Sequence, residues 1–135
     1  MTPAELKTIR ESLGLPVQWL ADRASVQRRS VEYWEAGRSN VPADVAELLL
    51  KLEAQFADAT RQALDVVDEK TAQHGGEPPE TVRLYRYRDD AALWSARPDM
   101  HGLPVTAHAA LLARVRLALL ARGQSVVIEY APLSA

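Results

Sequence analysis

The stretch that decides the fold is Ser25-Val26-Gln27-Arg28-Arg29-Ser30-Val31-Glu32-Tyr33-Trp34-Glu35-Ala36-Gly37-Arg38-Ser39. At 3.6 residues per turn it predicts a helix with Val31 and Trp34 on one side, while its charged and hydroxylated side chains point elsewhere. Gly37 can adopt the left-handed conformation that ends such a helix. One face therefore suits a protein core, and the other suits a charged partner.

The polar face of this helix has the chemistry of a major-groove reader. Arginine can bind guanine edges or phosphates, glutamine can pair with adenine, and tyrosine can donate to a phosphate. The alternative is an ordinary solvated helix surface, which is the common fate of a charge run. Gln27 stands where Ser or Thr usually caps such a helix, and it is a poor cap but a plausible reader. Glu32 either accepts from a cytosine amine or holds Arg28 or Arg29 as a helical neighbour, and we favour the second.

Two short helices are predicted upstream. The first follows Thr2 as its cap, with Pro3 in its first turn, and Gly14 ends it. The second runs from Pro16 to Ala24. Their inward residues are Leu6, Ile9 and Leu13 in the first helix and Val17, Leu20 and Ala21 in the second. The second helix and the one after it are joined by a tight turn, which makes a helix-turn-helix.

These residues resemble the lambda-repressor-like (Cro/C1, XRE) DNA-binding domains. The resemblance rests on Leu6, Ile9, Arg10, Leu13-Gly14-Leu15, Leu20-Ala21, Val26, Val31 and Glu35-Ala36-Gly37-Arg38. A closer resemblance is to anti-CRISPR-associated autoregulators of the second type and to YdiL-like proteins. This resemblance extends, more loosely, over the whole chain. That second resemblance rests on Leu6, Ile9 and Arg10 and on Arg29, Ser30, Tyr33, Trp34, Glu35, Gly37, Arg38, Ser39, Val41 and Pro42.

The resemblance implies a transcriptional repressor that binds an inverted-repeat operator on double-stranded DNA as a homodimer and regulates its own operon. It also implies that messenger RNA is a further partner. We place base readout on Arg29 first, with Gln27, Arg28 and Tyr33 beside it, and phosphate contacts on Arg38 and on Lys7 or Arg10. Gln18 and Ser30 complete the DNA-binding candidates, although the family's second-helix glutamine is matched here by Val17, one position before Gln18.

The rest of the chain predicts a mainly α protein with a small α+β tail. Residues 1–73 form the helix-turn-helix domain, whose long fourth helix runs without a breaker from about residue 40 to Gln73. The break at residues 74–79 is rich in glycine and proline. Residues 80–135 form a strand-helix-helix-strand dimerisation unit, with strands at 81–88 and 125–130, a short helix at 89–95 and an apolar helix from a Thr106 cap to Arg122. Apolar residues cover so much of this last helix that we expect it to be mostly buried.

This small tail predicts a second copy, because a pair of strands rarely holds alone. The long fourth helix exceeds what a small helix-turn-helix needs, so its second half faces either the tail or a partner chain, unless it is wholly a core helix of one molecule. The strand at 81–88 alternates arginine with tyrosine, which suits a nucleic-acid surface or an ordinary polar outer face.

Composition excludes several other classes. The chain has 135 residues and no cysteine, which removes disulfide scaffolds and thiolate metal sites. Taken over the whole chain, the net charge of −2 argues against a nucleic-acid partner. However, residues 41–75 hold seven acidic and three basic side chains, so the excess of acidic residues lies outside the candidate DNA-binding helix. No apolar run is long enough for a membrane span, and we expect a cytoplasmic protein without membrane contact.

An enzyme is the rival class that the sequence disfavours. The histidines are His74, His101 and His108, and they lack metal-ligand spacing. No nucleophile elbow or glycine-rich loop after a strand is present. We therefore expect no catalytic residues, cofactor or metal. The alternative that remains open is an antitoxin-like protein that binds a toxin and uses DNA binding for autoregulation.

Overall fold

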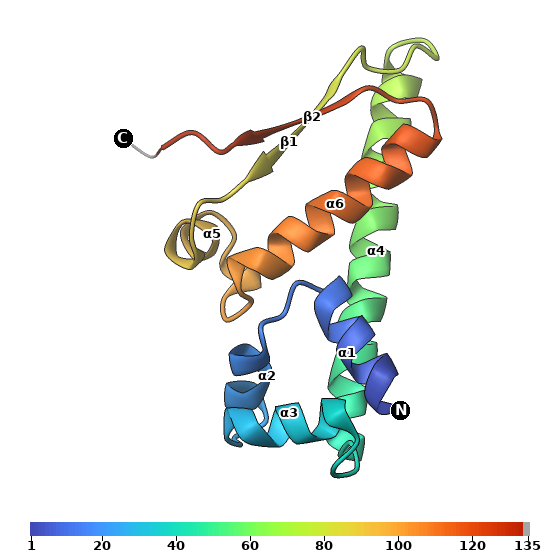
Figure 1. Cartoon of the computed structure of the whole chain (residues 1–135). Helices are drawn as coiled ribbons and strands as arrows, with labels where there is room; N and C mark the ends of the chain where they lie inside the picture. The colour runs from blue at the N-terminus through green and yellow to red at the C-terminus, as the bar shows by residue number, and fades with distance from the viewer. Residues whose placement is uncertain (134–135) are drawn as a thin grey trace. The chain divides into compact units, whose positions relative to one another are not determined.

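The computed structural model describes residues 1–133, which form a mainly helical protein with one two-stranded sheet (Figure 1). This confirms the prediction of a mainly α protein with a small strand-containing tail. The elements are α1 (Pro3–Ser12), α2 (Val17–Arg23), α3 (Arg28–Ala36), α4 (Ala43–Gln73), β1 (Val82–Arg86), α5 (Asp90–Ala96), the 3-10 helix η1 (Pro98–Met100), α6 (Val105–Ala121) and β2 (Val126–Tyr130). Within residues 1–133, no helix combines the length and apolar character needed to cross a bilayer.

The chain divides into two compact units, Met1–Phe56 and Ala57–Ala135. The division lies inside α4, whereas the sequence places a domain boundary in the turn at residues 74–79. The predicted functions of the two domains stay predictions. Ser134 and Ala135, the last residues of the predicted dimerisation domain, lie outside the described residues.

The first helix begins at the predicted cap, Thr2, which forms a capping box with Glu5. The backbone N–H of Glu5 donates to the Thr2 hydroxyl at 3.0 Å, and the Thr2 N–H donates to the Glu5 carboxylate at 3.0 Å. These two bonds satisfy backbone donors that no helical carbonyl can reach. The hydrogen bond from the Thr2 backbone to the carboxylate, followed by that from the Thr2 side chain, lowers the pKa of Glu5.

The core of the first unit consists of the apolar faces of its four helical segments. Val31, Trp34, Leu20 and Ala21 are buried as predicted, while Ile9 and Val17 are half-buried. Apolar residues on one face of each helix must pack against another element to leave water. The full set of buried apolar residues is Leu6, Leu13, Leu15, Leu20, Ala21, Val31, Trp34, Val45, Leu49 and Phe56.

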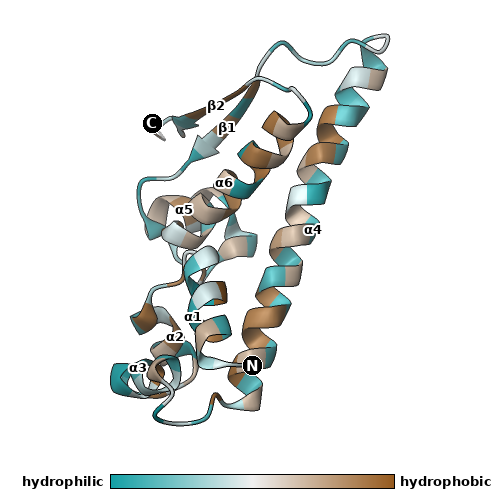
Figure 2. Cartoon of the chain, turned by 45° about the vertical axis from the view of Figure 1, so that its right-hand side comes forward, coloured by the Kyte–Doolittle hydropathy of each residue, from teal (hydrophilic) through white to brown (hydrophobic). Residues whose placement is uncertain are grey.

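The long helix α4 is continuous from Ala43 to Gln73, as the unbroken pattern predicts. Its three buried residues, Val45, Leu49 and Phe56, all belong to the first unit. The rest of α4 alternates polar and apolar residues along its length (Figure 2). The helix ends at the predicted break, where Gly75 and Gly76 take φ values of +69° and +91° that favour glycine.

The second unit contains a parallel pair of strands. Val82 of β1 lies opposite Val126 of β2, and Arg86 lies opposite Tyr130. Parallel neighbours need a long crossover, which α5, η1 and α6 supply here. Arg83 and Glu129 form an ion pair at 2.8 Å across the two strands. The predicted strand-helix-helix-strand order is therefore confirmed as an order of elements.

Helix α6 differs from its prediction in two ways. It begins at Val105 after Pro104, and the Val105 N–H donates to the Asp90 carboxylate at 2.7 Å, so the prediction of Thr106 as its cap is wrong. The prediction that the helix is mostly buried holds on one side only. Leu117 is 62% exposed and Leu120 is 40% exposed. Six residues of α6 are buried: Ala107, His108, Leu111, Leu112, Val115 and Leu119.

His108 is the buried titratable group of this helix. Its ring centroid lies 5.2 Å from that of Tyr87, and its Nδ1 atom has no hydrogen-bond partner among the described residues. Burial lowers the pKa of His108, and the positive charge of Arg97 lowers it further. The neutral imidazole is therefore the form that the folded protein accommodates.

We expect the free energy of unfolding to fall as the pH drops through the unfolded pKa of histidine, about 6.5. Below that pH the unfolded chain binds a proton that folded His108 resists, so acid favours unfolding, by at most about 1.4 kcal/mol per pH unit for one proton. Urea unfolding of the full chain between pH 7.5 and 5 measures this. His108→Leu should flatten the dependence, whereas His74→Gln, at an exposed position, should not. Equal slopes in all three proteins would contradict the prediction.

Candidate nucleic-acid interface

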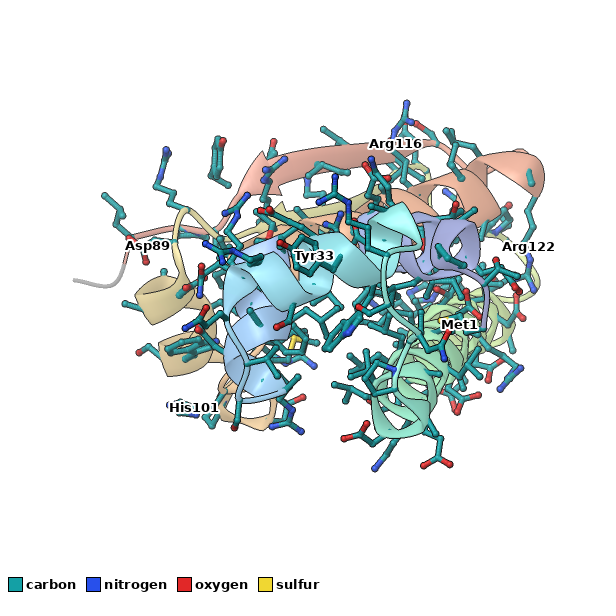
Figure 3. All side chains as sticks on the ribbon, turned by 60° about the horizontal axis from the view of Figure 1, so that its bottom comes forward. Met1, Tyr33, Asp89, His101, Arg116 and Arg122 are labelled. Carbon is teal, nitrogen blue, oxygen red and sulfur yellow. The ribbon has the colours of Figure 1, made fainter. Side chains whose placement is uncertain are left out.

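The exposed side of α3 holds most of the predicted DNA-binding residues. Gln27 is the N-cap residue and makes no side-chain capping bond, while Arg28 and Arg29 occupy the first turn and are exposed. Tyr33 is 38% exposed and lies on the side of α3 that faces the viewer in Figure 3. Side chains at the N-terminal end of a recognition helix are those that reach base edges in known DNA readers.

Short turns and a glycine fix the ends of this helix. Between α2 and α3 the backbone N–H of Val26 donates to the Ala21 carbonyl at 2.9 Å, and Ser25 takes a positive φ of 56°. Gly37 ends α3 with a φ of 78°, as predicted. Both α1 and α2 pack against α3 within the first unit. With Val31 and Trp34 buried, the opposite side of the helix is left facing solvent.

A buried ion pair joins α1 to α3. The Nε and Nη2 atoms of Arg10 donate to the two carboxylate oxygens of Glu35 at 2.6 and 2.9 Å, and Nη1 donates to the Leu15 carbonyl at 2.9 Å. The two side chains are only 9% and 10% exposed. The prediction that Arg10 contacts a phosphate is therefore wrong, because its guanidinium is buried and each of its three nitrogens already donates a hydrogen bond within the unit.

The sequence holds a signal for this pair that the prediction missed. Leu6, Arg10 and Leu13 share one face of α1 by their three- and four-residue spacing, so Arg10 lies on an apolar stripe. A charge in that position must be paired when it is buried. Glu35 directly follows Trp34, a residue of the apolar face of the next-but-one helix, which makes it a natural acid for this arginine.

Among the exposed arginines, Arg28 and Arg29 differ in their partners. The Nε of Arg28 donates to Glu32 at 2.9 Å, which confirms the expectation that Glu32 holds a neighbouring arginine. No side chain within residues 1–133 pairs with Arg29. Both guanidinium groups reach solvent, but Arg28 is held by a neighbour and Arg29 is not.

The remaining candidates lie nearby or are engaged elsewhere. Arg38 stacks over the Tyr33 ring at 5.5 Å, and this contact brings together two predicted DNA contacts across the Gly37 turn. Gln18 donates to Asp22 at 2.8 Å on its own helix α2. Ser30 is half-buried, and its backbone N–H donates to the Gln27 carbonyl at 2.9 Å. Lys7 is exposed on α1.

The family of the chain is shown by a similar protein and not by a family model, since no family model matches it. Over 91 residues it is 37% identical to the Aca2 repressor of Pectobacterium phage ZF40, an alignment that covers 67% of this chain and 72% of that protein. At this identity and coverage, the chain belongs to the Aca2 family of anti-CRISPR-associated regulators, as its resemblance to them implied. Whether it also belongs to the wider lambda-repressor-like group stays a prediction.

We expect Glu35→Gln to destabilise the protein by about 3–5 kcal/mol, because it leaves the Arg10 charge buried without a counter-charge. The matched control is Glu32→Gln on the same helix, where the exposed ion pair is worth about 1 kcal/mol or less. Urea unfolding of both variants, followed by circular dichroism, makes the comparison. A Glu35→Gln variant as stable as Glu32→Gln would show that the buried pair does not hold the unit together.

Proposed function

We propose that the chain is a transcriptional repressor, not an enzyme, and that it binds double-stranded DNA through the exposed side of α3. The observation that carries this proposal is the arginine-rich surface of α3, which the buried Arg10–Glu35 pair fixes to its unit. The similarity to a protein named as a repressor supports the same function.

In this proposal α2 and α3 act as a helix-turn-helix. Helix α3 enters the major groove, where Arg29 contacts a base edge with Gln27, Arg28 and Tyr33 beside it. Arg38, stacked on Tyr33, contacts a phosphate at the C-terminal end of the helix. Arg29 is the first choice for readout because its guanidinium is exposed and has no partner within residues 1–133.

A homodimer on an inverted repeat completes the proposed mechanism. One such helix contacts only a few base pairs, and two copies about 34 Å apart contact half-sites on one face of the duplex. The dimer then covers a promoter and blocks polymerase. We propose that this promoter belongs to the operon that encodes the chain itself.

Exposed apolar side chains of the second unit support the proposed dimer. Leu117 of α6 and Ile128 of β2 line one hollow of about 210 Å³, and both are exposed, at 62% and 37%. Both strands of the two-stranded sheet have an unpaired edge. Exposed apolar groups that lie close together mark interaction surfaces in soluble proteins. A second copy would cover them.

DNase footprinting of the full chain on its own upstream region tests the DNA-binding proposal. We expect a palindromic footprint with binding that weakens steeply as salt rises. Arg29→Ala should cost about 1–3 kcal/mol at this site, since it removes a base contact. Arg61→Ala is the control, because Arg61 is exposed on α4 in the second unit. A uniform, sequence-independent footprint would refute the proposed function.

The dimer is tested separately by sedimentation. We expect Leu117→Glu to shift the protein towards the monomer, because a charge would be buried at the proposed interface. Leu50→Glu is the matched control, since Leu50 is 50% exposed on α4 in the first unit. If wild-type protein sediments as a monomer at the concentrations that protect DNA, the homodimer is excluded.

A further inference from the structure

A carboxylate on the proposed DNA-facing side of α3 needs an explanation. Glu32 is exposed and lies one turn after Arg28, near the arginines that are proposed to approach phosphates and bases. A negative charge there repels the phosphate backbone, which supplies most of the sequence-independent affinity of DNA-binding proteins. At the proposed DNA-facing surface, the carboxylate should therefore weaken sequence-independent binding.

Stability of the free protein does not account for this carboxylate. The side chains of Arg28 and Glu32 are 59% and 54% exposed, and exposed ion pairs four residues apart on a helix add little to folding. Glu32 is also too exposed to contribute to the core that holds Val31 and Trp34. We therefore look for the role of the pair in its effect on the Arg28 side chain.

The geometry of the pair leaves one edge of the guanidinium free. Glu32 accepts from the Nε of Arg28 at 2.9 Å. Within residues 1–133, the two terminal nitrogens of Arg28, Nη1 and Nη2, donate no hydrogen bond. Those two nitrogens are the ones that can fork onto O6 and N7 of a guanine. A flexible side chain would lose conformational freedom on making that contact, and the bond to Glu32 restricts it beforehand.

We propose that Glu32 is a specificity-determining positioning residue, which holds Arg28 so that its terminal nitrogens meet one guanine of the operator. The inference rests on the proposed DNA-binding function. It assigns Glu32 two opposed effects, since it lowers affinity for any duplex and raises the preference for the operator. A residue that only shaped the helix would not produce effects of opposite sign.

The test compares full-length wild type, Glu32→Gln, Arg28→Ala and the double variant. Each protein is titrated with the footprinted operator, with a scrambled duplex of equal length, and with operators that carry 7-deazaguanine, which lacks the N7 acceptor, at one guanine at a time. Glu11→Gln is the matched control, because it removes one exposed acid from α1. Unchanged unfolding temperatures confirm that the variants are folded.

We expect Glu32→Gln to bind the scrambled duplex at least as tightly as wild type, while its preference for the operator falls about tenfold, the size of one guanine contact. One 7-deazaguanine position should weaken wild type and have less effect on Glu32→Gln and none on Arg28→Ala. In the Arg28→Ala background, Glu32→Gln should leave the preference unchanged. Glu11→Gln should keep the wild-type preference.

Two results would overturn the inference and leave the proposed function standing. One is a Glu32→Gln protein with the wild-type operator preference and the same 7-deazaguanine pattern. The other is an equal loss of preference when Arg28 is already absent, which would mean that Glu32 contacts a base directly. A wild-type protein with no preference for the operator would instead refute the proposed function, and the inference with it.

Discussion

The buried ion pair between Arg10 and Glu35 is the interaction on which the first unit depends. Taking two charges out of water is costly, and such a pair persists only where its geometry is good and its other donors are satisfied. Here the guanidinium donates to both carboxylate oxygens and to the Leu15 carbonyl. Because each charge must keep its partner, α3 has one favourable orientation against α1. That orientation turns Arg28 and Arg29 towards solvent.

The parts of this unit that the sequence predicted are those set by local rules. The Thr2 cap, the burial of Val31 and Trp34 and the left-handed Gly37 all follow from residue types and spacing within one or two turns. The role of Arg10 was predicted wrongly because its partner lies 25 residues away in the chain. Helical periodicity predicts on which face of a helix a residue lies, but not which element packs against that face. The assignment of bases or phosphates to Gln27, Arg29 and the other candidates stays a prediction, since no contact within the chain reports on DNA.

In the second unit, sequence patterns located the elements but not their pairing. The alternation of apolar and polar residues predicts the positions of β1 and β2 correctly. It does not predict the direction of one strand relative to the other, so the parallel register is seen only in the structure. The start of α6 depends on a bond from Val105 to Asp90 of another helix, which no local cap signal shows. The exposure of Leu117 likewise depends on what α6 lies against, and an apolar helix looks the same in sequence whether a partner covers it or not.

The parallel register also sets an order of events during synthesis. Val82 of β1 lies opposite Val126 of β2, so the sheet cannot form until residues 126–130 have left the ribosome. All the buried apolar side chains of the first unit lie at or before Phe56, so its core can form before both strands of the sheet have been made. Each nascent chain can therefore complete its α3 surface before it can form the sheet.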